Sequence, residues 1–172
     1  ERNFTDQYYM DNPNQTGLLS VSCNDIMNAD LVFDNDKTNF IFHSAFCGST
    51  LLARCLNIPT KAISIREPHT IFQMSAMKRA NPEYAHTSEE WKLMMRTITY
   101  FLSRGYHSNE VALIKPSNAM NNLIPDLFNS APQAKAVFLH STLEQFLISN
   151  LKKGKEYVNF CSSSLGMLTT TN

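Results

Sequence analysis

The sequence predicts an α/β fold in which a parallel β-sheet carries helices on both of its faces. Short apolar segments alternate along the chain with segments whose apolar residues recur at helical spacing, as in successive strand–helix–strand units. The chain has 172 residues, 43% of them hydrophobic, which is enough to build one core. We therefore expect a single domain over residues 1–172, with its regular part at 40–153.

The first strand and the first helix flank a short polar turn. Residues 40–43 form an apolar run, and residues 51–56 place apolar side chains on one helix face until Pro59 ends the pattern. A second strand is expected at 61–65, where apolar and β-branched residues gather. A short helix is expected to follow at 70–79.

A capping motif predicts the start of the next helix. Thr87 and Glu90 have the T-x-x-E spacing of a capping box, and the helix that they open is expected to end at Gly105. We expect the apolar face of this helix to form core together with the preceding one. The expected core residues from the two helices include Met74, Met77, Trp91, Met94 and Met95.

Two further strand–helix units complete the pattern. A third strand is expected at 111–114, followed by a helix at 119–129 that Pro125 breaks or kinks. A fourth strand is expected at 134–139 and a final helix at 142–153. The N-terminal 35 residues are ambiguous, because the apolar segments 18–22 and 31–33 suit either edge strands or packing segments.

The composition excludes several classes of protein. Lysine and arginine together number 15, as do aspartate and glutamate, so no basic excess indicates a nucleic-acid partner. The four cysteines have neither zinc-site nor disulfide-framework spacing, so we expect no metal and a reducing compartment. No apolar run is long enough to span a membrane, and we expect a cytoplasmic protein. The Ser/Thr-rich end of the sequence leads us to expect that a C-terminal portion is lacking.

The turn at residues 44–50 is the first candidate site. Small residues before a helix leave backbone amides free, and the positive end of the helix dipole favours a phosphate or sulfate there. Gly48, Ser49 and Thr50 supply the amides, and two of these residues add hydroxyl donors. The alternative is that Gly48 only permits a tight turn while the hydroxyls cap the helix.

This segment is not an intact nucleoside-triphosphate loop. The pattern GxxxxGK[ST] overlays on residues 43–50, but His43 stands at the first glycine and Ser49 at the lysine. Without that lysine, and without an acidic strand end for Mg²⁺, a nucleotide kinase is a weaker alternative.

Three segments in order resemble the P-loop-related sulfotransferases, especially their bacterial and tyrosylprotein-sulfotransferase-like branches. Residues 46–52 (FCGSTLL) are similar to the first loop of that family from the glycine onward, and Glu67-Pro68 to the end of its second strand. Residues 113–140 (LIKPSNAMNNLIPDLFNSAPQAKAVFLH) look like its third strand, the helix that follows and the approach to the fourth strand. Ser149 matches a serine that holds the 3′-phosphate of the cofactor, whereas Ser141 stands in place of the accompanying arginine.

The resemblance implies a three-layer P-loop-type sheet and a 3′-phosphoadenosine 5′-phosphosulfate (PAPS) donor whose sulfuryl group passes to an unknown hydroxyl acceptor. Glu67 is then the candidate base, with His69 as a second one, and Lys115 stabilises charge on the bridging oxygen. The cofactor-binding candidates are Cys47, Gly48, Ser49, Thr50, Ser141 and Ser149.

Two alternatives remain beside this interpretation. Phe46 replaces a cationic loop residue and Ser141 replaces an arginine, which also suits a degenerate protein that binds an anion or nucleotide without chemistry. Glu67 equally suits a structural ion pair with Arg66 or Lys115. Because Glu67 and Lys115 each end a parallel strand, we expect both to face the crevice beside the turn.

Overall fold

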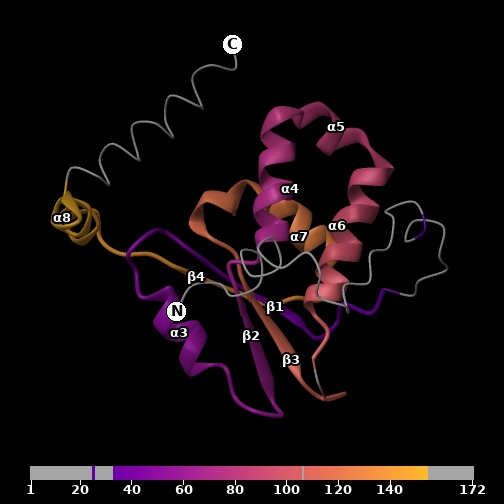
Figure 1. Ribbon diagram of the computed structural model, residues 1–172, viewed down its shortest axis with the longest axis horizontal. Helices are drawn as coiled ribbons and strands as arrows, with labels where there is room; N and C mark the ends of the chain where they lie inside the picture. Colours follow the sequence, from indigo (N-terminus) through magenta and orange to yellow (C-terminus); the bar gives the residue numbers. More distant parts are fainter. Residues whose placement is uncertain (1–24, 26–32, 106, 155–172) are drawn as a thin grey trace, which may run out of the picture.

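The computed structural model describes Asp25, residues 33–105 and residues 107–154. Four strands form one sheet in the order β2-β3-β1-β4 (Figure 1). Every pairing between them is parallel, which confirms the predicted α/β class. The strands are β1 (Thr38–His43), β2 (Ala62–Arg66), β3 (Val111–Lys115) and β4 (Ala136–Leu139).

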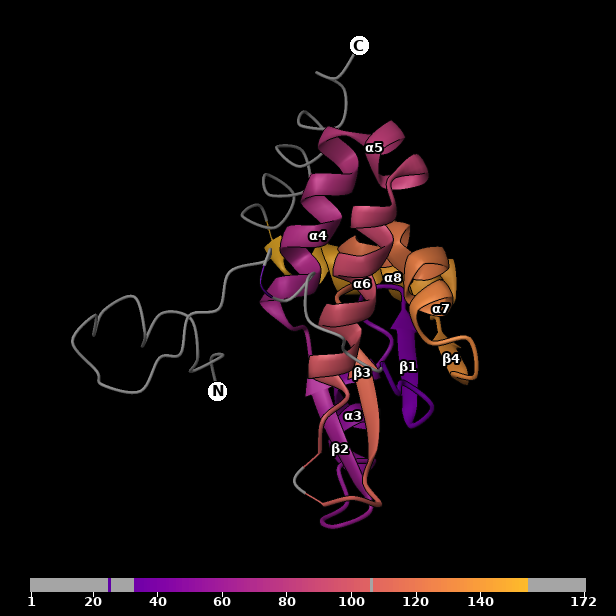
Figure 2. The same cartoon turned by 90° about the vertical axis from the view of Figure 1, so that its right-hand side faces the viewer.

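The helices follow the strands along the chain. Helices α4 to α7 gather on one side of the sheet, and α3 lies on the opposite side, in contact with β1 and β2 (Figure 2). This agrees with the expected cover on both faces. The helices are α3 (Ser49–Cys55), α4 (His69–Ala80), α5 (Pro82–Thr87), α6 (Glu89–Leu102), the 3₁₀ helix η1 (Asn118–Leu123), α7 (Ile124–Ser130) and α8 (Leu143–Lys152).

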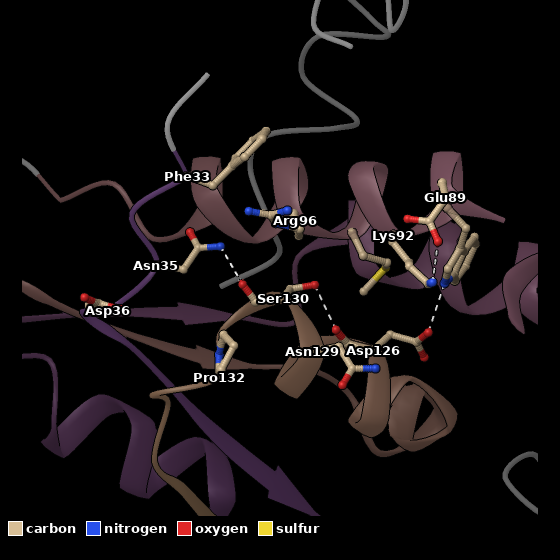
Figure 3. A pocket seen from close by; sticks show the side chains of 12 residues that line it. Phe33, Asn35, Asp36, Glu89, Lys92, Arg96, Asp126, Asn129, Ser130 and Pro132 are labelled. Atoms are coloured by element: carbon tan, nitrogen blue, oxygen red, sulfur yellow. Dashed lines mark hydrogen bonds and ion pairs between the residues drawn. The ribbon is translucent and has the colours of Figure 1, made fainter. Parts of the chain in front are cut away.

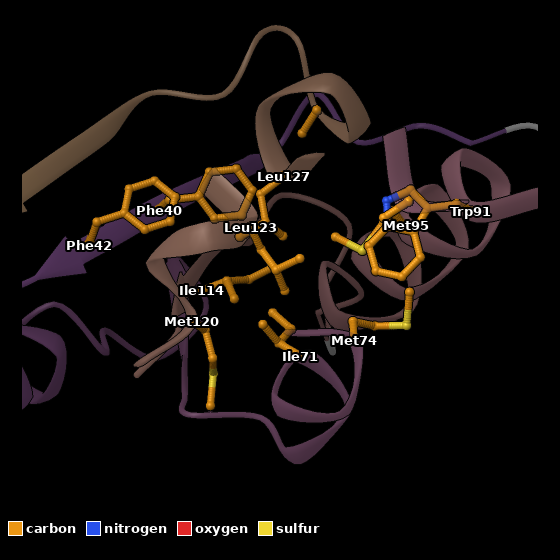
Figure 4. Packing of buried hydrophobic residues seen from close by; sticks show 12 residues of the cluster. Phe40, Phe42, Ile71, Met74, Trp91, Met95, Ile114, Met120, Leu123 and Leu127 are labelled. Carbon is orange, nitrogen blue, oxygen red and sulfur yellow. The ribbon is translucent and has the colours of Figure 1, made fainter. Parts of the chain in front are cut away.

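The main core lies between the sheet and helices α4, α6 and α7 (Figure 4). Alternate residues of β1 point to this side because side chains of a strand alternate between its faces, and Phe40 and Phe42 stack at 5.4 Å. Trp91 and Met95 are each 1% exposed, as predicted for core residues. Met77 is 46% exposed, so its assignment to the core was wrong.

The start of α6 differs from the predicted capping box by one residue. The Oγ of Ser88 accepts a hydrogen bond from the amide of Trp91 at 3.2 Å, so Ser88 is the cap. Thr87 cannot serve because it still belongs to α5, where its hydroxyl donates to the carbonyl of Glu83 at 2.9 Å. The helix also ends at Leu102, earlier than the predicted Gly105.

Helix α5 has no counterpart in the prediction. Asn81 caps it by accepting from the amide of Tyr84 at 3.1 Å, and Pro82 occupies its first turn, where a missing N–H costs nothing. The hydroxyl of Tyr84 donates to Glu90 of the next helix at 2.7 Å. That hydrogen bond to the carboxylate raises the pKa of Tyr84 and ties the two helices together.

Pro125 breaks the helix predicted at 119–129, as expected. The segment begins as η1 and continues as α7 from Ile124, with Pro125 in the first turn of the new helix. A proline at this position disrupts no hydrogen bond of α7 and ends the preceding 3₁₀ turn. The segment expected at 18–22, and residues 31–32 of the segment expected at 31–33, lie outside the described residues, whereas Phe33 is described and belongs to no strand.

Candidate functional site

The turn between β1 and α3, residues 44–48, is held in a conformation with two left-handed residues. Phe46 has φ 59° and Gly48 has φ 80°. The left-handed region suits glycine, whereas for Phe46 it costs free energy that the surroundings must offset. The thiol of Cys47 donates to the carbonyl of Ser44 at 3.0 Å, so this predicted site residue holds the turn in shape.

The backbone amides at the start of α3 are open to a ligand. Among the described residues, no protein carbonyl accepts from the amides of Gly48, Ser49 or Thr50, and α3 has no side-chain cap. The alternative in which the hydroxyls of Ser49 and Thr50 cap this helix is therefore wrong. Successive amides around left-handed residues form a concave set of donors that suits an anion. Gly48 and Thr50 are exposed, and Ser49 is buried.

Glu67 and Lys115 form an ion pair at the carboxyl edge of the sheet. The Nζ of Lys115 lies 2.6 Å from Oε1 of Glu67, and the amide of Glu67 also donates to the carbonyl of Lys115 at 2.7 Å. The lysine side chain is 0% exposed and that of the glutamate 46%. Glu67 has φ 52°, a strained conformation for a non-glycine residue. The two predicted catalytic residues thus meet, as a pair that also fits the structural alternative.

His43 connects the turn to the end of β3. Its Nδ1 lies 2.8 Å from the carbonyl oxygen of Ser44 and its Nε2 lies 3.1 Å from that of Pro116. A neutral imidazole can donate from only one nitrogen, so both contacts are hydrogen bonds only in the protonated ring. Because Pro116 follows Lys115 directly, His43 links the ion pair to the first residue of the turn.

His69 lies two residues beyond Glu67, at the start of α4. Its ring is exposed and stacks on Phe72 with centroids 5.8 Å apart. This position leaves the imidazole near the strand end that carries the ion pair, where it can meet solvent and a bound molecule.

Two serine hydroxyls at the turn are buried and have no hydrogen-bond partner within the described part of the chain. They belong to Ser44 and Ser141, which follow the paired strands β1 and β4. The amide of Ser44 donates to the carbonyl of Leu139 at 2.9 Å, so the ends of both strands lie side by side. Buried hydroxyls usually find partners, so these two are available to a ligand. Ser149 lies half-buried on α8.

A cation that was not among the predicted cofactor-binding residues lies beside the turn. The Nζ of Lys153, just beyond α8, lies 5.1 Å from the centroid of the Phe46 ring, and Phe146 packs on the same ring at 6.2 Å. A cation over an aromatic face is attracted by the ring quadrupole. Lys153 therefore places a positive charge beside Phe46, the loop position at which the resembled family carries a cationic residue. The Lys152-Lys153 pair at a helix end was the signal for it.

Comparisons of the chain with protein-family models, curated proteins and solved structures found no match. In the described part of the chain, no group of three or more His, Cys, Asp or Glu side chains is arranged to hold a metal ion. No described helix is long and apolar enough to cross a membrane. The function therefore has to be argued from the geometry of the turn and its neighbours.

Proposed function

We propose that the chain binds a PAPS-type nucleotide at the β1–α3 turn and transfers its sulfuryl group to a hydroxyl-bearing acceptor. The observation that carries the proposal is the set of amides at Gly48, Ser49 and Thr50, which no protein carbonyl of the described chain engages. They follow a strand of a parallel sheet at its carboxyl end, where α/β proteins bind their ligands. Since α3 has only seven residues, the proposal rests on these amides and the nearby cations rather than on a helix dipole.

The remaining cofactor contacts are assigned by position. Lys153 supplies the positive charge that Phe46 lacks, since its ammonium lies over that ring. Ser141 and Ser149 are assigned to the 3′-phosphate, and the unpaired hydroxyl of Ser141 supports this role. Cys47 contributes by holding the turn through its bond to Ser44.

The transfer step needs a base and a cation. The acceptor oxygen forms a bond to sulfur as the bond from sulfur to the bridging phosphate oxygen breaks, and 3′-phosphoadenosine 5′-phosphate leaves. Glu67 takes the acceptor proton, with His69 as the second candidate, and Lys115 stabilises the leaving oxygen. The ion pair of Glu67 and Lys115 must open first. The anionic nucleotide drives this opening because it competes with the carboxylate for the same ammonium.

Calorimetric titration with 3′-phosphoadenosine 5′-phosphate and with ATP tests the proposal. We expect the first nucleotide to bind and ATP to bind at least about 10-fold more weakly. The Lys153→Gln variant should lose about 10-fold in affinity for the first nucleotide, while Lys152→Gln, its exposed neighbour, should bind like the wild type. Equal binding of both nucleotides, or no binding of either, would contradict the proposal.

A second candidate function is anion or nucleotide binding without turnover. The closed ion pair between Glu67 and Lys115 favours it, because the Oε1 that would take the acceptor proton is already engaged by the ammonium. The Glu67→Gln variant separates the two candidates. Under either candidate it should still bind the nucleotide. Only if the protein is a sulfotransferase does the wild type transfer a sulfuryl group and the variant lose that activity. A kinase, the third alternative, requires ATP to bind more tightly than the bisphosphate nucleotide.

We also propose a cytoplasmic location, with the nucleotide and a hydroxyl-bearing acceptor as partners and no nucleic-acid partner. The described cysteines, Cys47 and Cys55, are free thiols, which supports a reducing compartment. The equal numbers of acidic and basic side chains give no electrostatic reason for nucleic-acid binding.

A further inference from the structure

A pocket lies at the amino end of β1. It has a volume of about 500 Å³ and is enclosed by α6, α7 and the segment at 33–36 that leads into β1 (Figure 3). Volumes of this order hold small organic molecules. Because residues 33–36 precede β1, the pocket sits at the amino end of that strand, whereas the proposed nucleotide site follows its carboxyl end.

Several polar groups of this pocket already have partners. Asp126 accepts from Nζ of Lys78 at 2.6 Å and from the indole of Trp91 at 2.9 Å. Lys92 pairs with Glu89 at 2.5 Å on the exposed side of α6. These groups shape the pocket and need no ligand to satisfy them.

Asn35 carries a polar group that remains unsatisfied. Its side-chain nitrogen donates to the carbonyl of Ser130 at 2.8 Å, and this bond fixes the orientation of the amide. The residue is only 6% exposed, yet its Oδ1 has no hydrogen-bond partner among the described residues. An acceptor that is held in place, buried and unpaired calls for a donor from a bound molecule.

Arg96 is an exposed cation of the same pocket. Its guanidinium lies 5.2 Å from the centroid of the Phe33 ring, which orients it, and no acidic side chain among the described residues pairs with it. Figure 3 shows Arg96 extending from α6 toward the side of the pocket where Asn35 lies. A guanidinium in this setting suits a carboxylate, with which it forms two parallel hydrogen bonds.

We propose that this pocket binds a small organic carboxylate that also carries an N–H or O–H donor and an apolar group. The carboxylate meets Arg96, and the donor meets Oδ1 of Asn35. The apolar group lies against Phe33, which lines the same pocket beside the buried Trp91 and Met95. Amino acids and hydroxy acids with an apolar side chain have this chemistry. The site is independent of the nucleotide site proposed at the β1–α3 turn.

Trp91 provides the readout, because it is the only tryptophan of the chain and lines the pocket. We would titrate the full chain with phenyllactate and follow tryptophan fluorescence. Phenylpropionate lacks the hydroxyl donor and phenyllactamide lacks the carboxylate. We expect a saturable change with phenyllactate and an affinity at least about 10-fold lower for each of the other two.

Two exposed arginines give matched variants, because Arg96 lines the pocket whereas Arg54, on α3, does not. Arg96→Gln should weaken phenyllactate binding at least about 10-fold, whereas Arg54→Gln should leave it unchanged, with circular dichroism reporting that both are folded. The proposal is overturned if phenyllactate gives no saturable change up to about 10 mM, in which case water suffices to satisfy Asn35. Equal affinities of the two variants, or of the three probes, would overturn it as well.

Discussion

At the scale of single residues, the buried ammonium of Lys115 pays a larger desolvation cost than its partner in the ion pair. It is fully buried while its partner Glu67 is half-exposed, so the two halves of the ion pair have unequal desolvation costs. Removing the carboxylate leaves a buried charge without a counter-charge. Removing the ammonium leaves a carboxylate that water can still reach.

This asymmetry predicts the order of stability of two variants. Lys115→Met keeps an apolar stem of similar length, and we expect its free energy of unfolding to stay within about 1 kcal/mol of the wild type. Glu67→Gln should lose about 1–3 kcal/mol, because the amide cannot balance the buried ammonium. Urea denaturation followed by circular dichroism measures both values. A larger loss in Lys115→Met than in Glu67→Gln would contradict the explanation.

The sequence could predict that Glu67 and Lys115 meet, because both end parallel strands and such ends share one edge. It could not predict that the lysine is fully buried or that Glu67 has a positive φ, since both depend on how β2 and β3 are packed. The sequence offered the Lys152-Lys153 pair as a signal of positive charge, but it could not predict that Lys153 approaches Phe46. That approach depends on where α8 lies relative to the turn, and no local pattern encodes that placement.

At the scale of elements, periodicity predicted the strands and the long helices, whereas helix starts depended on single hydrogen bonds. Ser88 and Thr87 are adjacent hydroxyl residues, and both look like caps in the sequence. The choice between them was decided by α5, which the sequence analysis did not predict and which retains Thr87 in its last turn. Pro125 was predicted well because the physical effect of a proline does not depend on its tertiary context.

The cap of α6 can be tested directly. Ser88→Ala removes the acceptor for the amide of Trp91, and we expect it to lower the free energy of unfolding by about 1 kcal/mol. Thr87→Ala is the matched control, because it loses only a hydroxyl bonded within its own helix and should cost less than about 0.5 kcal/mol. Thermal and urea denaturation measure the difference. Equal losses of the free energy of unfolding, or a larger loss in Thr87→Ala, would indicate that Thr87 caps α6, as the sequence suggested.

At the scale of the whole molecule, the order of the strands decides which surfaces are covered. The sequence predicted parallel strands but not the order β2-β3-β1-β4, because strand order depends on how the crossovers pack. That order buries β1 between two neighbours and leaves β4 at an edge of the described sheet. Val137 and Phe138 of β4 are accordingly 54% and 53% exposed.

Helix α8 carries exposed apolar side chains of its own. Leu143, Leu147 and Leu151 are spaced to share one helix face, and they are 72%, 50% and 74% exposed. Contiguous exposed apolar surface binds hydrophobic dyes and promotes association. We expect the double variant Leu143→Gln, Leu151→Gln to bind less dye and to sediment with a weaker dependence on concentration. Its free energy of unfolding should change by less than about 0.5 kcal/mol, because these side chains are largely solvated.

A buried leucine provides the contrast for α8. Leu127 is 0% exposed in the main core, so Leu127→Ala should lose about 2–5 kcal/mol of stability while the dye binding of the folded protein stays unchanged. Dye fluorescence should therefore change only in the double variant of α8, and the stability measured by urea denaturation should fall only in Leu127→Ala. If the double variant lost as much stability as Leu127→Ala, the leucines of α8 would be packed against other parts of the chain. The leucine face of α8 would then belong to the interior of the folded protein in solution.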